Sequence, residues 1–96
     1  MKLKYSPESV SDLQRLHDFV AHKNPLSARK IAVEIQQAAE KLKLFPQVGL
    51  PVSRAESPEL IRDLYVGNYT LRYLISSGEL IYVLRVWHNK EIEKDL

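Results

Sequence analysis

Cationic and aromatic side chains recur at alternate positions in the last third of the chain. Thr70 and Arg72 lie two residues apart in one apolar segment, and Arg85 and Trp87 lie two apart in the next. Successive side chains of a β-strand point to opposite faces, so in paired strands these four would share one face. Arginine binds phosphate or carboxylate through paired hydrogen bonds, and tryptophan often anchors protein interfaces. The pattern predicts a cationic surface for phosphate or an acidic peptide. The structural alternative is a half-solvated sheet face, on which arginine stems and Trp87 cover apolar neighbours.

His88 and Lys90 extend this cationic stretch toward the end of the chain. Histidine can act as a general acid or base near neutral pH. No carboxylate or second base is fixed beside His88 in the sequence, which favours a structural hydrogen-bonding role. We therefore assign no catalytic residue. The candidates for binding a partner or a target are Arg72, Arg85, Trp87, His88 and Lys90.

The composition argues against several other kinds of site. The chain has no cysteine, so disulfides, thiolate nucleophiles and cysteine-based zinc sites are excluded. Its glycines stand apart and form no phosphate-binding loop. His17 and His22 do not have the i, i+4 spacing of a helical metal pair. We expect no metal and no small-molecule cofactor.

Charge and hydropathy limit the partners and the location of the protein. The formal net charge of +2 is too small to indicate nucleic-acid binding by itself, so direct binding of nucleic acid should be weak or absent. No segment approaches the ~20 apolar residues that span a bilayer, and no signal-peptide pattern follows Met1. We expect a cytoplasmic protein without a membrane partner.

Two helices and an edge strand are predicted in the first half of the chain. Residues 2–5 alternate polar and apolar side chains, as in a short edge strand. Ser6-Pro7 is a helix start, with serine as N-cap and proline at the first helical position, and that helix should run to about residue 22. Asn24-Pro25 repeats the signal, and apolar residues at helical spacing predict a second helix that ends at Phe45, before a proline. The short connection makes the two helices antiparallel neighbours.

Three strands are predicted after a proline-rich linker without regular structure at residues 46–58. They cover residues 61–66, 69–76 and 79–88 and form an antiparallel meander. A two-residue turn at Ser77-Gly78 would place Ser76 opposite Glu79. This register turns eight side chains of the last two strands toward the helices: Tyr69, Leu71, Tyr73, Ile75, Leu80, Tyr82, Leu84 and Val86. The sequence thus predicts one α+β domain over residues 1–96, with an N-terminal edge strand, an antiparallel helical hairpin and a three-stranded antiparallel β-meander.

The order and spacing of these pieces resemble the RelE/ParE family of bacterial toxins. The helical hairpin is followed by Pro-x-x-Gly at Pro46 to Gly49, by Tyr-x-x-x-Tyr at Tyr69 to Tyr73, and by an apolar strand that ends in His88. The resemblance covers about residues 5–90. It implies a RelE/ParE-like fold and a toxin of a type II toxin–antitoxin system, which a cognate antitoxin neutralises by wrapping around it.

The resemblance also implies one of two activities. RelE-like members cleave mRNA in the ribosome with basic and polar residues of the concave sheet face, whereas ParE-like members poison DNA gyrase and block replication. Nucleases of the family commonly carry an arginine after the first tyrosine of the central strand, where this chain has Thr70. Arg72 lies two residues further, a displacement of ~6–7 Å along a strand.

We therefore predict a ParE-like toxin that stabilises gyrase in a DNA-cleaved state, with a cognate antitoxin and gyrase as partners. The alternative is a RelE-like ribosome-dependent mRNA endonuclease, to which Arg72, Arg85, His88 and Lys90 would contribute. An inert member that binds only an antitoxin-like partner is a third interpretation. If Arg72 and Arg85 are exposed recognition residues, replacing them should weaken partner binding at little cost in stability.

Overall fold

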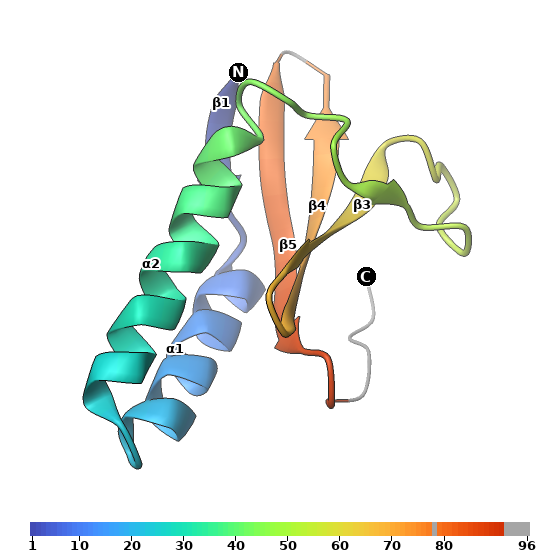
Figure 1. The fold of residues 1–96 in the computed structure, drawn as a ribbon. Coiled ribbons are helices and arrows are strands. Elements are labelled where there is room, and N and C mark those ends of the chain that lie inside the picture. Colours follow the sequence, from blue (N-terminus) through green and yellow to red (C-terminus); the bar gives the residue numbers. More distant parts are fainter. Residues whose placement is uncertain (78, 92–96) are drawn as a thin grey trace.

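The computed structural model describes residues 1–77 and 79–91, and its first half is a strand followed by a helical hairpin (Figure 1). Strand β1 spans Lys2–Tyr5, helix α1 spans Pro7–Ala21 and helix α2 spans Pro25–Lys41. Both predicted N-caps are present. The Ser6 hydroxyl oxygen accepts a hydrogen bond from the Ser9 N–H at 2.9 Å, and the Asn24 side chain accepts one from the Ser27 N–H at 3.1 Å. Each cap satisfies a backbone donor that the first turn leaves unpaired.

Helix α2 ends earlier than the sequence predicted. Its last residue is Lys41, whereas the prediction placed the end at Phe45. From Leu42 to Leu44 the backbone N–H groups bond to carbonyls three residues back, which tightens the chain into turns before the proline. Pro46 indicated that the helix must end by Phe45, but it did not predict the turns from Leu42 to Leu44 that come before it.

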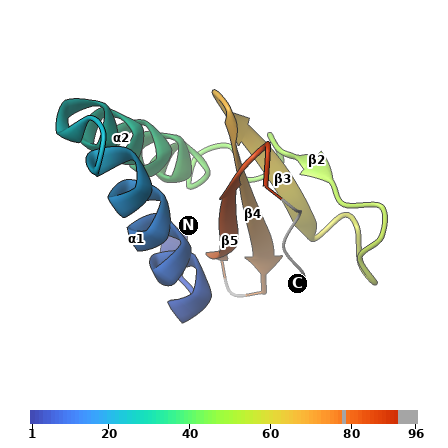
Figure 2. The same cartoon turned by 90° about the horizontal axis from the view of Figure 1, so that it is seen from below.

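The remaining strands form a five-stranded mixed sheet with β1. Strand β2 spans Leu50–Pro51, β3 spans Ile61–Val66, β4 spans Tyr69–Ser76 and β5 spans Leu80–His88. The order across the sheet is β1-β5-β4-β3-β2, with β1 parallel to β5 and the other pairs antiparallel. Helices α1 and α2 cover one face of this sheet (Figure 2). The predicted α+β architecture is confirmed. The linker is not wholly irregular, because its residues Leu50 and Pro51 pair with β3.

The register of the β4–β5 hairpin differs from the prediction. Ser76 pairs with Leu80, so the connection spans three positions, 77–79, and Glu79 adopts a left-handed φ of 64°. Gly78, the second residue of the predicted turn, lies outside the described residues. Relative to the predicted pairing, the observed pairing is offset by one residue from the turn to Tyr73. It is offset by two residues from Arg72 onward, beyond an irregularity between Arg72 and Tyr73.

This new register exchanges the core residues of β5. Ile81 and Val83 are fully buried against the helices, where Leu80 and Tyr82 were expected. The irregularity then lets Val86 keep its predicted core position, as a β-bulge does by inserting an extra residue into one strand. The β4 residues face the helices as predicted. The buried cluster consists of Leu16, Ile35, Ala39, Leu42, Leu71, Tyr73, Ile81, Val83 and Val86.

A close approach of strand β4 to the linker explains the Pro-x-x-Gly motif. The buried Tyr73 hydroxyl donates to the Pro46 carbonyl at 2.7 Å and accepts from the Gly49 N–H at 3.0 Å. A Cβ on residue 49 would lie 2.7 Å from the Tyr73 hydroxyl oxygen and 2.9 Å from the Asp63 carbonyl oxygen. Only glycine fits this contact, which fixes the linker to the sheet. Among the described residues, no helix is long and apolar enough to cross a membrane.

Candidate functional site

Arg72 is the most deeply buried of the candidate residues, contrary to the expectation of an exposed cationic surface. It is 1% exposed and holds Asp63 of β3, its direct cross-strand partner, through Nε–Oδ1 and Nη2–Oδ2 contacts of 2.7 and 2.9 Å. Its guanidinium carbon lies 5.0 Å from the centre of the Trp87 ring, and Trp87 itself is 5% exposed. We call Asp63, Thr70, Arg72 and Trp87 the outer cluster, because they lie on the sheet face away from the helices. The prediction of an open surface here was wrong, since a carboxylate and an aromatic ring already engage the arginine.

Thr70 also has a defined role in the outer cluster. It is 2% exposed, pairs with Trp87 across the sheet, and its hydroxyl hydrogen-bonds to the Asn89 side chain. This bond fixes the chain immediately after β5. Thr70 is therefore a buried structural contact in this protein.

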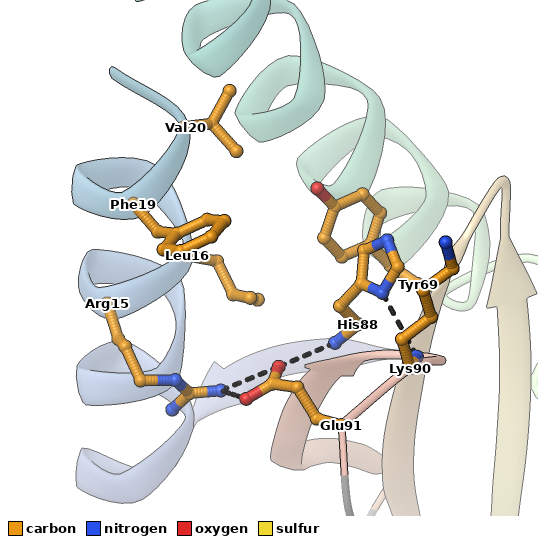
Figure 3. Close-up of a pocket in the computed structure, with 8 residues that line it drawn as sticks. All are labelled: Arg15, Leu16, Phe19, Val20, Tyr69, His88, Lys90 and Glu91. Atoms are coloured by element: carbon orange, nitrogen blue, oxygen red, sulfur yellow. Dashed lines mark hydrogen bonds and ion pairs between the residues drawn. The ribbon is translucent and has the colours of Figure 1, made fainter. Parts of the chain in front are cut away.

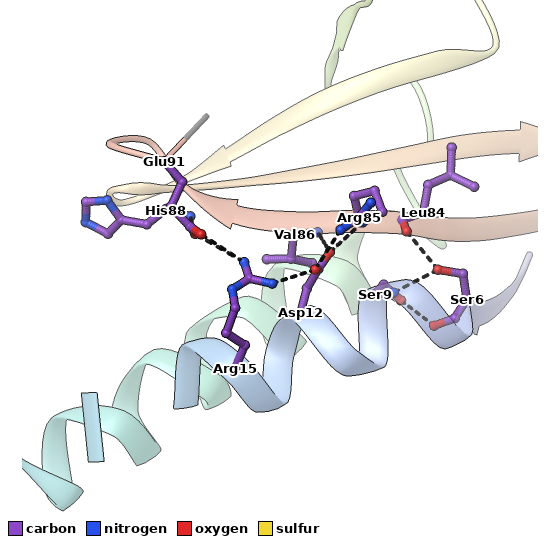
Figure 4. A network of polar contacts seen from close by, with 9 residues as sticks. All are labelled: Ser6, Ser9, Asp12, Arg15, Leu84, Arg85, Val86, His88 and Glu91. Atoms are coloured by element: carbon purple, nitrogen blue, oxygen red, sulfur yellow. Dashed lines mark hydrogen bonds and ion pairs between the residues drawn. The ribbon is translucent and has the colours of Figure 1, made fainter. Parts of the chain in front are cut away.

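Arg85 lies opposite Arg72 in the sheet but reaches helix α1 (Figure 4). Its Nε and Nη2 donate to the two oxygens of Asp12 at 2.8 and 3.0 Å. Asp12 also accepts from the Val86 N–H at 2.9 Å and from Arg15 at 2.7 Å. Burial by itself raises the pKa of the Asp12 carboxyl. The hydrogen bonds from Arg85, Val86 and Arg15 lower it by more, so the net pKa lies below its ordinary value. The network fastens α1 to the middle of β5.

His88 and Lys90 lie on the other side of the sheet from the outer cluster. The His88 ring meets Tyr69 edge-on, with centroids 5.1 Å apart, and its Nδ1 accepts from the Lys90 N–H at 3.0 Å. The His88 N–H donates to Glu91 at 2.8 Å. These side chains border a cavity that faces α1 (Figure 3).

The five candidate residues thus fall into three settings. Arg72 and Trp87 pack in the outer cluster, Arg85 joins the Asp12 network, and His88 and Lys90 face the cavity. Within the described part of the chain, no group of three or more His, Asp or Glu residues is placed to hold a metal ion. The arrangement is suited to packing and recognition, because its cations do not converge on one point.

Sequence reasoning missed the carboxylates that engage the two arginines. Asp63 could have been found, since Val66 pairs with Tyr69 across a two-residue turn and counting outward pairs Asp63 with Arg72. Asp12 carried no such signal, because 73 positions separate it from Arg85. Two residues that border the cavity were likewise missed, because Phe19 was assigned only to the apolar stripe of the first helix and Arg15 was given no role.

Comparison with known proteins gives the family. The profile described as "ParE toxin of type II toxin-antitoxin system, parDE" matches residues 3–93. The chain belongs to the ParE toxin family. It is similar to Toxin RelE2 of Caulobacter vibrioides, with 28% identity over 80 residues that cover 83% of this chain and 85% of the relative.

Two solved structures share the fold of this ParE-family toxin. The chromosomal ParDE toxin–antitoxin system of P. aeruginosa contains a chain with a TM-score of 0.74 and 22% identity, over 92% of this chain and 95% of that one. The toxin–antitoxin complex RelBE2 of Mycobacterium tuberculosis contains one with a TM-score of 0.65 and 21% identity, over 94% and 92% of the two chains. At these identities the likeness concerns the fold.

Proposed function

We propose that this ParE-family toxin binds DNA gyrase, holds it in a DNA-cleaved state and so blocks replication, and that a cognate antitoxin neutralises it by binding. Family membership supports the toxin role. The antitoxin partner is supported by the two similar structures, which come from toxin–antitoxin assemblies. The proposal places the toxin in the cytoplasm with its target.

The observation that favours gyrase over RNA as the target is the dispersal of the candidate cations. RNA cleavage needs a base, an acid and charge stabilisation that converge on one 2′-hydroxyl and one phosphate. Here Arg72 and Arg85 hold carboxylates of β3 and α1, respectively. His88 and Lys90 border a cavity on the opposite side of the sheet. A binding mechanism makes no demand for convergence.

A supercoiling assay with purified toxin tests the proposal. Micromolar toxin should inhibit ATP-dependent supercoiling of relaxed plasmid by gyrase and should accumulate linear DNA after protease treatment. Heat-unfolded toxin is the control and should do neither. Inhibition without accumulated cleavage would contradict the cleaved-state mechanism while retaining gyrase as the target.

The mRNA endonuclease remains the alternative, because a curated relative at 28% identity is named as a RelE toxin. Primer extension on mRNA from translating ribosomes separates the two. New 5′ ends on the mRNA where ribosomes are bound, together with gyrase supercoiling that the toxin leaves unchanged, would replace the gyrase proposal with the nuclease.

A further inference from the structure

A cavity of about 510 Å³ lies between α1 and the ends of β4 and β5 (Figure 3). This volume is within the range of about 300–1,000 Å³ that is typical of ligand-binding pockets. Its walls are largely apolar. Leu16 is buried at 8% exposure, while Phe19 is 70% exposed. The lining residues are Arg15, Leu16, Phe19 and Val20 of α1, with Tyr69, His88, Lys90 and Glu91 across from them.

The unengaged polar groups around this cavity can all donate hydrogen bonds. Because His88 Nδ1 accepts from the Lys90 N–H, a neutral ring carries its hydrogen on Nε2. Within the described residues, no hydrogen-bond partner is found for His88 Nε2, for the Lys90 ammonium or for the Tyr69 hydroxyl. An incoming group that accepts hydrogen bonds would satisfy them.

The one carboxylate of the lining is already engaged. Glu91 accepts from the His88 N–H at 2.8 Å and pairs with Arg15 at 3.2 Å. Arg15 is held between Glu91 and Asp12, so the cation of the lining that has no carboxylate partner among the described residues is Lys90. The Lys23 ammonium adds a further cation 5.8 Å from the centre of the Phe19 ring. The electrostatics of the cavity and its mouth therefore favour an anion beside an apolar group.

We propose that this cavity binds a segment of a partner protein that presents an aromatic or branched aliphatic side chain next to a carboxylate. The apolar side chain would enter between Leu16 and Tyr69, and the carboxylate would meet Lys90 and His88. A polypeptide is favoured over a small molecule because Phe19 lies largely exposed at the cavity, where a flanking stretch of chain would cover it. The inference goes beyond the proposed function, since it specifies the chemistry of a partner whether or not gyrase is the target.

Two blocked peptides test this chemistry on the full-length protein. Acetyl-Ala-Trp-Glu-Ala-amide and acetyl-Ala-Trp-Gln-Ala-amide differ only in the charge beside the tryptophan. In ¹H–¹⁵N spectra, both should shift amide signals of Phe19, Tyr69 and His88. The Glu peptide should bind about fivefold to tenfold more tightly at low salt, as expected for one charge-assisted hydrogen bond.

Matched variants assign the preference to the cavity. Lys90→Gln should bring the two peptides close to equal affinity, whereas Phe19→Ala should weaken both about equally. Lys2→Gln, which removes a lysine at the opposite end of the sheet, should change neither.

Three results would overturn the inference. The first is the absence of peptide-induced shifts around the cavity, and the second is equal affinity of the two peptides for the unaltered protein. The third is binding of N-acetyltryptophan through its free carboxylate without binding of either peptide, which would indicate a site for small carboxylates. Failure of gyrase inhibition would leave all three readouts unaffected.

Discussion

Near the end of β5, the two sides of the sheet carry similar residues that differ in whether neighbouring side chains already engage them. In the outer cluster, Arg72 is 1% exposed, holds Asp63 and lies against Trp87. On the α1 side, Lys90 and His88 border a cavity with donor groups unengaged among the described residues. All four of these cationic or aromatic side chains lie in or directly after two paired strands. The difference teaches that residue type sets what a side chain can bind, while its neighbours decide whether it is still available.

The bulge between β4 and β5 decides which face the later side chains of β5 occupy. It places Arg85 opposite Arg72 instead of opposite Leu71, and it returns Val86 to the core, while the Arg85 guanidinium reaches Asp12 of α1. A regular ladder continued from the turn would pair Arg72 with Leu84 and would turn Arg85 toward the core opposite Leu71, where burying its charge would be costly. Each arginine instead has a carboxylate from a different element.

Replacing Arg72, which is buried in the outer cluster, should have the largest effect on stability. Arg72→Ala leaves the Asp63 carboxylate without this partner and opens space beside Trp87, so the free energy of unfolding should fall by about 3–5 kcal/mol. Urea denaturation measures the change. Lys90→Ala, at the cavity on the α1 side of the sheet, is the control and should lower the free energy of unfolding by less than about 0.5 kcal/mol. Equal effects of the two variants would mean that the two sides do not differ as described. The expectation from sequence, that losing Arg72 would cost little stability, rested on an exposed side chain.

Neutralising Asp12 should have an intermediate effect that depends on pH. Asp12→Asn should lower stability near pH 7 by about 2–3 kcal/mol, because an amide cannot balance Arg85 and accept the same bonds. Folding lowers the pKa of the Asp12 carboxyl, so its contribution is present above the unfolded value of about 3.9 and is lost as the pH falls through the folded pKa. Denaturation curves at a series of pH values should show the gap between variant and unaltered protein closing below about pH 4.

Asp18→Asn provides the control on the same helix, because the Asp18 side chain is 65% exposed. It should change stability near pH 7 by less than about 0.5 kcal/mol. A gap for Asp12→Asn that stays constant into acid would show that the carboxylate acts through shape rather than charge.

Changes at the cavity mouth should have the smallest effect on stability and would sharpen the contrast. Phe19→Ala removes a side chain that is 70% exposed, so thermal unfolding should move by no more than the equivalent of about 0.5 kcal/mol. The same variant should weaken the tryptophan peptides described above. A large loss of stability would mean that Phe19 belongs to the core and that the cavity is not a free surface.

Several elements could be predicted from the sequence because their causes are local. Ser6-Pro7 and Asn24-Pro25 start helices through bonds within one turn, and the Gly67-Asn68 turn fixes the β3–β4 register. The faces of β5 could not be predicted in this way. They depend on a three-residue connection and on a bulge, each of which moves every later side chain along the strand.

The sequence by itself determined the α+β order of elements, the capped helices, the core face of β4 and the resemblance to RelE/ParE toxins. These follow from periodicity and from contacts between near neighbours in the chain. Only the tertiary structure decided that Arg72 and Arg85 are engaged by Asp63 and Asp12, and that His88 and Lys90 face a cavity with α1. The physical reason is that burial and charge pairing depend on which distant side chains arrive at the same place, and local patterns carry no record of that.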